Sequence, residues 1–152
     1  MAALHEKYLP LLARFLLGGI FFTFGVNGFF HLFPLPPAPE AAENFLGALA
    51  ATGYMFPAIK IIEVVAGLLL ILGRYVPLAL VLLAPVIVNI GLFHAFLAPG
   101  GLALATVVLL SELYLAWSYR DLYRPMFTTR AVPTERKSPE QQFHRDVTAA
   151  AH

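Results

Sequence analysis

Six polar side chains interrupt the apolar stretches of this sequence, and their types suit hydrogen bonding and ion pairing with a ligand or a partner. An ionisable group inside a membrane costs at least ~2.5 kcal/mol on insertion scales, so such groups normally face a bundle interior and mark function or obligatory packing. The predicted ligand- or partner-binding residues are Asn27, His31, Lys60, Glu63, Asn89 and His94.

Helical spacing predicts that an acid and a base share one helix face. Lys60 and Glu63 are three residues apart, and Gly67 follows Glu63 by one turn. A glycine at this position allows another helix to approach closely. The alternative is structural: Lys60 reaches the membrane surface by itself and leaves Glu63 without a cation.

The remaining polar candidates fall into two pairs with different geometry. Asn27 and His31 are four residues apart and therefore stack on one face. Asn89 and His94 are five apart, so their directions differ by about 140 degrees and only one of them need face the interior. Pro85, four residues before Asn89, is expected to kink its helix and to free a carbonyl.

Arg14 and Glu112 form a second predicted pair, away from the first six residues. Arg14 lies one turn into the first apolar stretch and Glu112 past the middle of the last. We predict that they approach each other as a buried ion pair. Such a pair either takes part in the function of the protein or only fixes the register between helices.

The residue types present in the chain exclude several kinds of catalytic and metal site. The chain contains no cysteine, which excludes disulfides, thiolate metal ligands, iron–sulfur clusters and dithiol relays. Ser111 stands next to Glu112 without the histidine that a nucleophilic triad needs, and no His-x-x-x-His or Glu-x-x-His spacing occurs on a predicted helix. We therefore predict no catalytic residue and no metal site.

Four long apolar stretches must position these side chains. With 59% hydrophobic and 12% charged residues, the composition lies outside the range of soluble proteins. A membrane-spanning helix needs about 20 apolar residues, and the sequence offers such stretches at 11–33, 54–72, 76–97 and 101–119. The last two links are too short for anything but antiparallel neighbours. The prediction is an all-α, up-down transmembrane four-helix bundle over residues 1–125.

The segments outside the four spans are expected to form a short helix and a tail. The link after the first span is rich in proline, and residues 40–51 then carry apolar side chains at helical spacing. This pattern predicts a short extracytoplasmic helix lying on the membrane, the alternative being an ordinary loop. Residues 126–152 are polar and proline-containing, and we expect a disordered cytoplasmic tail.

The distribution of cations predicts the orientation in the lipid bilayer. Lys60 stands alone on one side, whereas the other side carries Lys7, Arg14, Arg74, Arg120, Arg124, Arg130, Arg136, Lys137 and Arg145. Positive loops stay in the cytoplasm, so both termini are expected there, in a bacterial inner membrane. The six polar candidates then lie in the outer half. The basic residues reflect this orientation in the membrane and do not indicate nucleic-acid binding.

Several of these features together resemble DoxX-like membrane proteins. The likeness covers roughly residues 11–120: Arg14, then Phe24-Gly25-Val26-Asn27-Gly28, a proline-rich link, and a Glu-x-x-x-Gly-Leu-x-Leu-x-x-Gly element from Glu63 to Gly73. Many relatives carry a lysine soon after the first-span glycine, where this chain has Gly28-Phe29-Phe30-His31. The resemblance implies the four-helix fold, and a group that includes subunits of quinone-linked oxidoreductases, helpers in redox-stress complexes and receptor chaperones.

Three hypotheses for function follow. The leading one is a non-catalytic accessory or chaperone-type module that binds a membrane partner, and with it a small hydrophobic ligand, through the buried polar face. The alternative is a quinone- or haem-linked subunit, with His31 and His94 as axial haem ligands or His94 and Glu63 holding a quinone. The third is a small-solute or proton transporter relaying through Glu63 and Glu112. Glycines of the first span serve either internal packing or a homodimer: Gly18, Gly25 and Gly28.

Overall fold

The computed structural model describes residues 2–129, with side chains from residue 8 onward. Within this range every regular element is a helix, which confirms the predicted all-α class. The α-helices are α1 (Ala2–Phe30), α2 (Glu40–Ala51), α3 (Met55–Leu72), α4 (Val76–Phe96) and α5 (Leu102–Ser118). Three 3-10 turns follow the last two helices: η1 (Pro99–Gly101), η2 (Arg120–Leu122) and η3 (Arg124–Phe127).

Four of the helices are long and apolar enough to cross a membrane, as predicted. Their spanning portions are Tyr8–Phe30, Met55–Leu72, Val76–Phe96 and Pro99–Ser118. The protein is therefore an integral membrane protein. The first span ends three residues before the predicted boundary at residue 33, because His31 leaves the helix with φ +49°.

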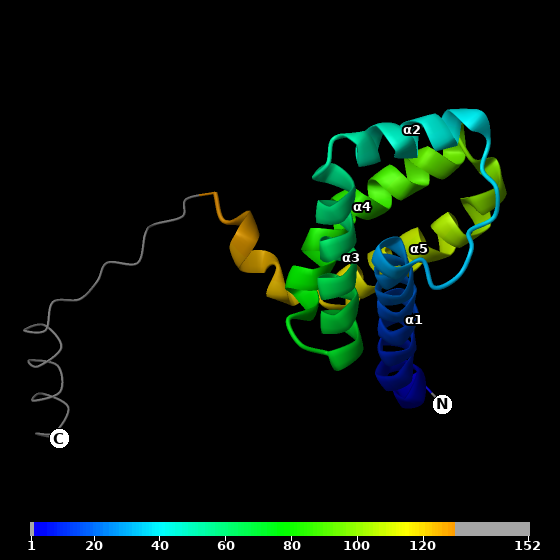
Figure 1. Ribbon diagram of the computed structural model, residues 1–152. Helices are drawn as coiled ribbons and strands as arrows, with labels where there is room; N and C mark the ends of the chain where they lie inside the picture. Colours follow the sequence, from blue (N-terminus) through cyan, green and yellow to red (C-terminus); the bar gives the residue numbers. More distant parts are fainter. Residues whose placement is uncertain (1, 130–152) are drawn as a thin grey trace, which may run out of the picture.

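The bundle has two ends, which serve below as reference points (Figure 1). The N-terminal end carries the start of α1, the α3–α4 turn and the end of α5, whereas the α2 end carries α2 and the α4–α5 turn. Helices α1 and α3 run side by side, and α4 and α5 run obliquely to them. Helix α2 lies across its end of the bundle, where Phe45 stacks against Phe93 of α4 with ring centroids 5.8 Å apart.

Helix α2 confirms that residues 40–51 are helical rather than an ordinary loop. Pro39 precedes it, and Glu40 and Glu43 occupy its first turn, where carboxylates are favoured by the helix dipole. Ala42 is fully buried, so this helix packs on the bundle. Its position on the membrane surface and outside the cytoplasm stays a prediction.

Short turns enforce the up-down order at the N-terminal end. Gly73 ends α3 in the left-handed conformation at φ 68°, and its N–H donates to the carbonyls of Leu69 and Leu70. Glycine is favoured there because it has no Cβ to clash. Tyr75, at φ 53°, then begins α4 immediately, so α3 and α4 must be antiparallel neighbours.

The core consists of apolar side chains contributed by all four spans. Its most buried members include Leu17, Phe21, Leu70, Leu80, Leu83, Ile87, Val108 and Leu115. Of the predicted polar tail, residues 126–152, only 126–129 lie within the described range, and η3 covers the first two of them. The predicted disorder of residues 130–152 lies outside the described residues.

Candidate functional site

Helices α1 and α3 approach each other so closely that their backbones touch. A Cβ on Gly67 would lie 2.6 Å from the backbone nitrogen of Phe22, and one on Gly18 would lie 2.9 Å from the carbonyl oxygen of Gly67. The close approach predicted at Gly67 is confirmed. Gly18 therefore serves internal packing rather than a homodimer.

Lys60 and Glu63, which were predicted to share one helix face, form an ion pair within this α1–α3 contact. The Lys60 Nζ lies 2.7 Å from Oε2 of Glu63, and only 18% and 5% of the two side chains is exposed. The lysine stem crosses α1 at Gly28, where a Cβ would lie 2.6 Å from the Lys60 Cδ. Gly25 likewise faces Glu63, since its Cβ would lie 3.1 Å from the Glu63 Cβ. The pair is thus closed by two glycines of the first helix.

Asn27 is buried, but its amide binds the protein's own backbone. Its Nδ2 donates to the carbonyl of Phe33 at 3.2 Å, and its Oδ1 accepts from the N–H of Phe33 at 2.9 Å. The N–H of His31 donates to the carbonyl of Asn27 at 2.9 Å. These bonds fold the chain back as it leaves α1. Helical spacing could not predict them, because Phe33 lies beyond the helix.

The two histidines occupy separate and different positions. His31 is exposed, in the left-handed conformation that terminates α1. The Nδ1 of His94 lies 2.9 Å from the carbonyl oxygen of Ala98, and its ring occupies the space that a Cβ on Gly101 would need. His94 therefore fastens α4 to the turn before α5, and the structure does not bring it together with His31.

Asn89 and His94 point to different sides of α4, as their spacing predicts. His94 turns inward and is half-buried, whereas Asn89 is exposed on the outer surface of the bundle. The six candidates therefore do not converge on one site. Lys60 and Glu63 meet each other, Asn27 and His94 bind backbone, and Asn89 and His31 face outward.

The predicted ion pair between Arg14 and Glu112 is not formed. The salt bridges among the described side chains are Lys60–Glu63 and Arg124–Asp121. The Arg14 guanidinium instead lies against Gly73, where a Cβ would be 2.5 Å from its Nη1. Carbonyls at a helix C-terminus attract a cation, which explains why Arg14 turns toward α3 rather than α5. Nε of Arg14 and Oε2 of Glu112 are both buried without a hydrogen-bond partner among the described residues.

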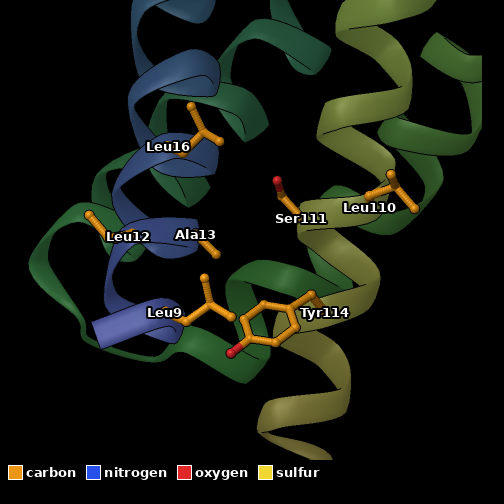
Figure 2. Close-up of a pocket in the computed structure, with 7 residues that line it drawn as sticks. All are labelled: Leu9, Leu12, Ala13, Leu16, Leu110, Ser111 and Tyr114. Atoms are coloured by element: carbon orange, nitrogen blue, oxygen red, sulfur yellow. The ribbon is translucent and has the colours of Figure 1, made fainter. Parts of the chain in front are cut away.

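An apolar groove lies elsewhere, between α1 and α5 toward the N-terminal end (Figure 2). It encloses about 490 Å³ and is lined by Leu9, Leu12, Ala13, Leu16, Leu110, Ser111 and Tyr114. The Ser111 hydroxyl donates to the carbonyl of Val107 at 2.7 Å. None of the six candidates lines this groove. Sequence spacing could not predict it, because it depends on how far α1 and α5 diverge.

The sequence over the first three spans is similar to one known protein family. The DoxX family model matches residues 9–95. The chain belongs to the DoxX family. No curated protein and no solved structure matches it. The matched segment of this DoxX chain includes the Lys60–Glu63 pair and its glycines, and it ends one residue after His94. Helix α5, which carries Glu112 and one wall of the groove, lies outside it.

The side chains that could hold a metal ion or a haem are histidines and carboxylates. In the part of the chain that the structure describes, no group of three or more His, Asp or Glu side chains is arranged to hold a metal ion. Among the described side chains the imidazoles are those of His31, which is exposed, and of His94, whose Nδ1 lies 2.9 Å from the carbonyl oxygen of Ala98. Chemically, the closed polar contacts of this DoxX chain are suited to fixing helix positions.

Proposed function

We propose that this DoxX protein is a non-catalytic accessory module that binds another membrane protein through the outer surface of its bundle. The observation that carries the proposal is the closed Lys60–Glu63 pair, with Nζ and Oε2 2.7 Å apart and the lysine stem covered by Gly28. This departs from the sequence hypothesis of a buried polar face as the binding surface, because Lys60 and Glu63 bind each other.

Asn27 and His94 are likewise bound within the chain. Asn27 uses both ends of its amide on Phe33, and His94 binds the carbonyl of Ala98. Hydrogen bonds and ion pairs between membrane helices fix register, and small residues allow the backbones to pack. If these side chains hold the helices in position, their burial is explained and no ligand has to be invoked.

What remains for a partner is the outer surface of the spans. It is rich in large apolar side chains that the bundle does not bury, such as Leu110, Leu113 and Trp117 on α5. Helices associate in membranes through packing of such faces. A module without a soluble domain in its described range has this surface as its main means of recognition.

The cation distribution supports placement in a bacterial inner membrane with both termini in the cytoplasm. Arg74, Arg120 and Arg124 lie outside the spans at the N-terminal end and are exposed. Lys60, at the α2 end, is neutralised by Glu63. The excess of exposed positive charge therefore belongs to one side, as the positive-inside rule requires of the cytoplasmic side.

The test is purification of the intact complex. The tagged protein is extracted from its native membranes in a mild detergent, and co-purifying proteins are quantified against an unrelated four-span protein with the same tag. The proposal predicts one membrane protein in a fixed ratio to this chain. Isolation of the chain alone, with measurable turnover of a substrate, would contradict it.

A second candidate function, binding of a quinone or lipid-like molecule, is favoured by the α1–α5 groove. Its walls are largely leucine, with the Tyr114 ring at one end (Figure 2), and such a surface suits an isoprenoid or acyl chain. Mass spectrometry of lipids retained by the purified protein tests this. Haem ligation by His31 and His94 is tested by the visible spectrum, since a Soret band requires a bound haem.

A further inference from the structure

Asn89 is an amide exposed on a membrane-spanning face. It lies in α4 seven residues before Phe96, which places it about 10 Å inside the α2 end of the span. Its neighbours on this surface, Val88 and Leu92, are 56% and 53% exposed and apolar. Among residues 8–129 its side chain has no hydrogen-bond partner.

An amide in this position is costly. Moving such a group from water into hydrocarbon without a hydrogen bond costs roughly 4–8 kcal/mol. Hydroxyls of α5 avoid this cost by donating to their own helix, as Thr106 does to Leu102 at 2.8 Å and Ser111 to Val107 at 2.7 Å. Asn89 does not, so its donors and acceptor require a group from outside the bundle.

Pro85 adds a second polar feature to the same face. It lies one turn before Asn89, is exposed, and has no N–H to donate to the carbonyl of Val81. The Val81 side chain is also exposed. This face of α4 therefore presents an amide and a carbonyl that lacks its usual helical donor within two turns, surrounded by aliphatic side chains.

We propose that a second copy of this chain covers this face, with α4 packed against α4. Copies inserted with the same orientation hold α4 parallel and Asn89 at the same depth, so a two-fold axis along the membrane normal brings the two amides together. An amide carries both hydrogen-bond donors and an acceptor, so the Asn89 amides of the two copies hydrogen-bond to each other. The face carries no charge that would select a different partner.

This inference goes beyond the proposed binding of another membrane protein and uses a different surface from the α1 glycines. Gly18, Gly25 and Gly28 are covered by α3 and are not available to a dimer. The homodimer forms through α4, and α1 and α5 stay free for a different partner.

The absence of cysteine makes the test direct. Val88→Cys places one thiol on the α4 face, and Val65→Cys places one on α3 at a similarly exposed valine. Both variants are treated in native membranes with copper phenanthroline, which oxidises two thiols to a disulfide, and are separated on a non-reducing gel. The expected result is a product of twice the chain mass, at least fivefold more abundant for Val88→Cys.

A second variant isolates the amide. Asn89→Leu in the Val88→Cys background is expected to lower the cross-linked fraction at least threefold. Since Asn89 faces outward, this variant keeps its helical circular dichroism and thermal unfolding, which are measured alongside. Equal cross-linking from Val65 and Val88, a product of another mass, or no effect of Asn89→Leu overturns the inference. A membrane protein that still co-purifies with the Asn89→Leu variant leaves the proposed function standing.

Discussion

The stem of Lys60 passes directly over Gly28, where the absence of a side chain on α1 leaves room for the lysine. A Cβ on Gly28 would lie 2.6 Å from the Lys60 Cδ, and the ion pair beyond it measures 2.7 Å. The charge pair and the glycine contact are thus one structural unit, in which α1 covers the lysine and α3 supplies both charges.

Removing the lysine alone should destabilise the bundle. Lys60→Met leaves the buried Glu63 without its cation, and we expect a loss of up to about 3 kcal/mol in the free energy of unfolding. Adding Glu63→Gln removes the unpaired charge and should restore most of that loss. Unfolding in mixed micelles, followed by circular dichroism for both single variants and the double variant, measures the coupling. Strict additivity of the two substitutions would contradict an interacting pair.

The glycines of the α1–α3 contact should differ sharply from a glycine beside them. Gly67→Ala places a methyl group 2.6 Å from the backbone of Phe22, so α1 must move away. We expect a loss of about 2 kcal/mol or more. Gly19 has open space around its Cβ position, and Gly19→Ala should be neutral or stabilise the helix by up to about 1 kcal/mol. Thermal unfolding of the two variants makes the comparison, and equal effects would show that the helices do not touch at Gly67.

Asn27 should control the segment that leaves α1. Asn27→Ala removes both hydrogen bonds to the backbone of Phe33, with an expected cost of about 1–3 kcal/mol. Hydrogen exchange at the Phe33 amide should accelerate in the variant. The control is Leu32→Ala, since Leu32 is exposed and lies between the two hydrogen-bonded partners. If the Phe33 amide exchanges as slowly in Asn27→Ala as in the wild type, the Asn27 side chain does not hold this segment.

Arg14 and Glu112 should behave as independent residues. Because they form no ion pair, the effects of Arg14→Met and Glu112→Gln are expected to add to within about 0.5 kcal/mol. Glu112→Gln alone should be well tolerated, since the carboxyl has no cationic partner to lose. A double-mutant cycle on unfolding free energy gives the coupling, and a value above about 1 kcal/mol would restore the ion pair that the sequence predicts.

Helical periodicity predicted those parts of the site that lie within one helix or depend on one glycine. Lys60 and Glu63 are neighbours because residues three apart share a face, and Asn89 and His94 point to different sides of α4 because they are five residues apart. The four spans and the helix at 40–51 follow from hydropathy, proline and spacing in the same way.

Relations between helices and links could not be predicted in this manner. Arg14 was expected to meet Glu112, but its guanidinium lies against Gly73 at the end of α3. Asn27 binds Phe33 only because His31 takes a left-handed turn, which no periodic pattern encodes. The groove between α1 and α5 likewise depends on the angle at which those helices separate.

The central claim is that the Lys60–Glu63 pair holds the scaffold and does not itself bind the partner. Native mass spectrometry of complexes from native membranes, comparing the wild-type chain with the Lys60→Met/Glu63→Gln double variant, tests it most directly. We predict that the variant retains its partner protein in the wild-type ratio. Loss of the partner, or of a bound small molecule, from a variant that is still folded would contradict the account and return the pair to the role of a binding site.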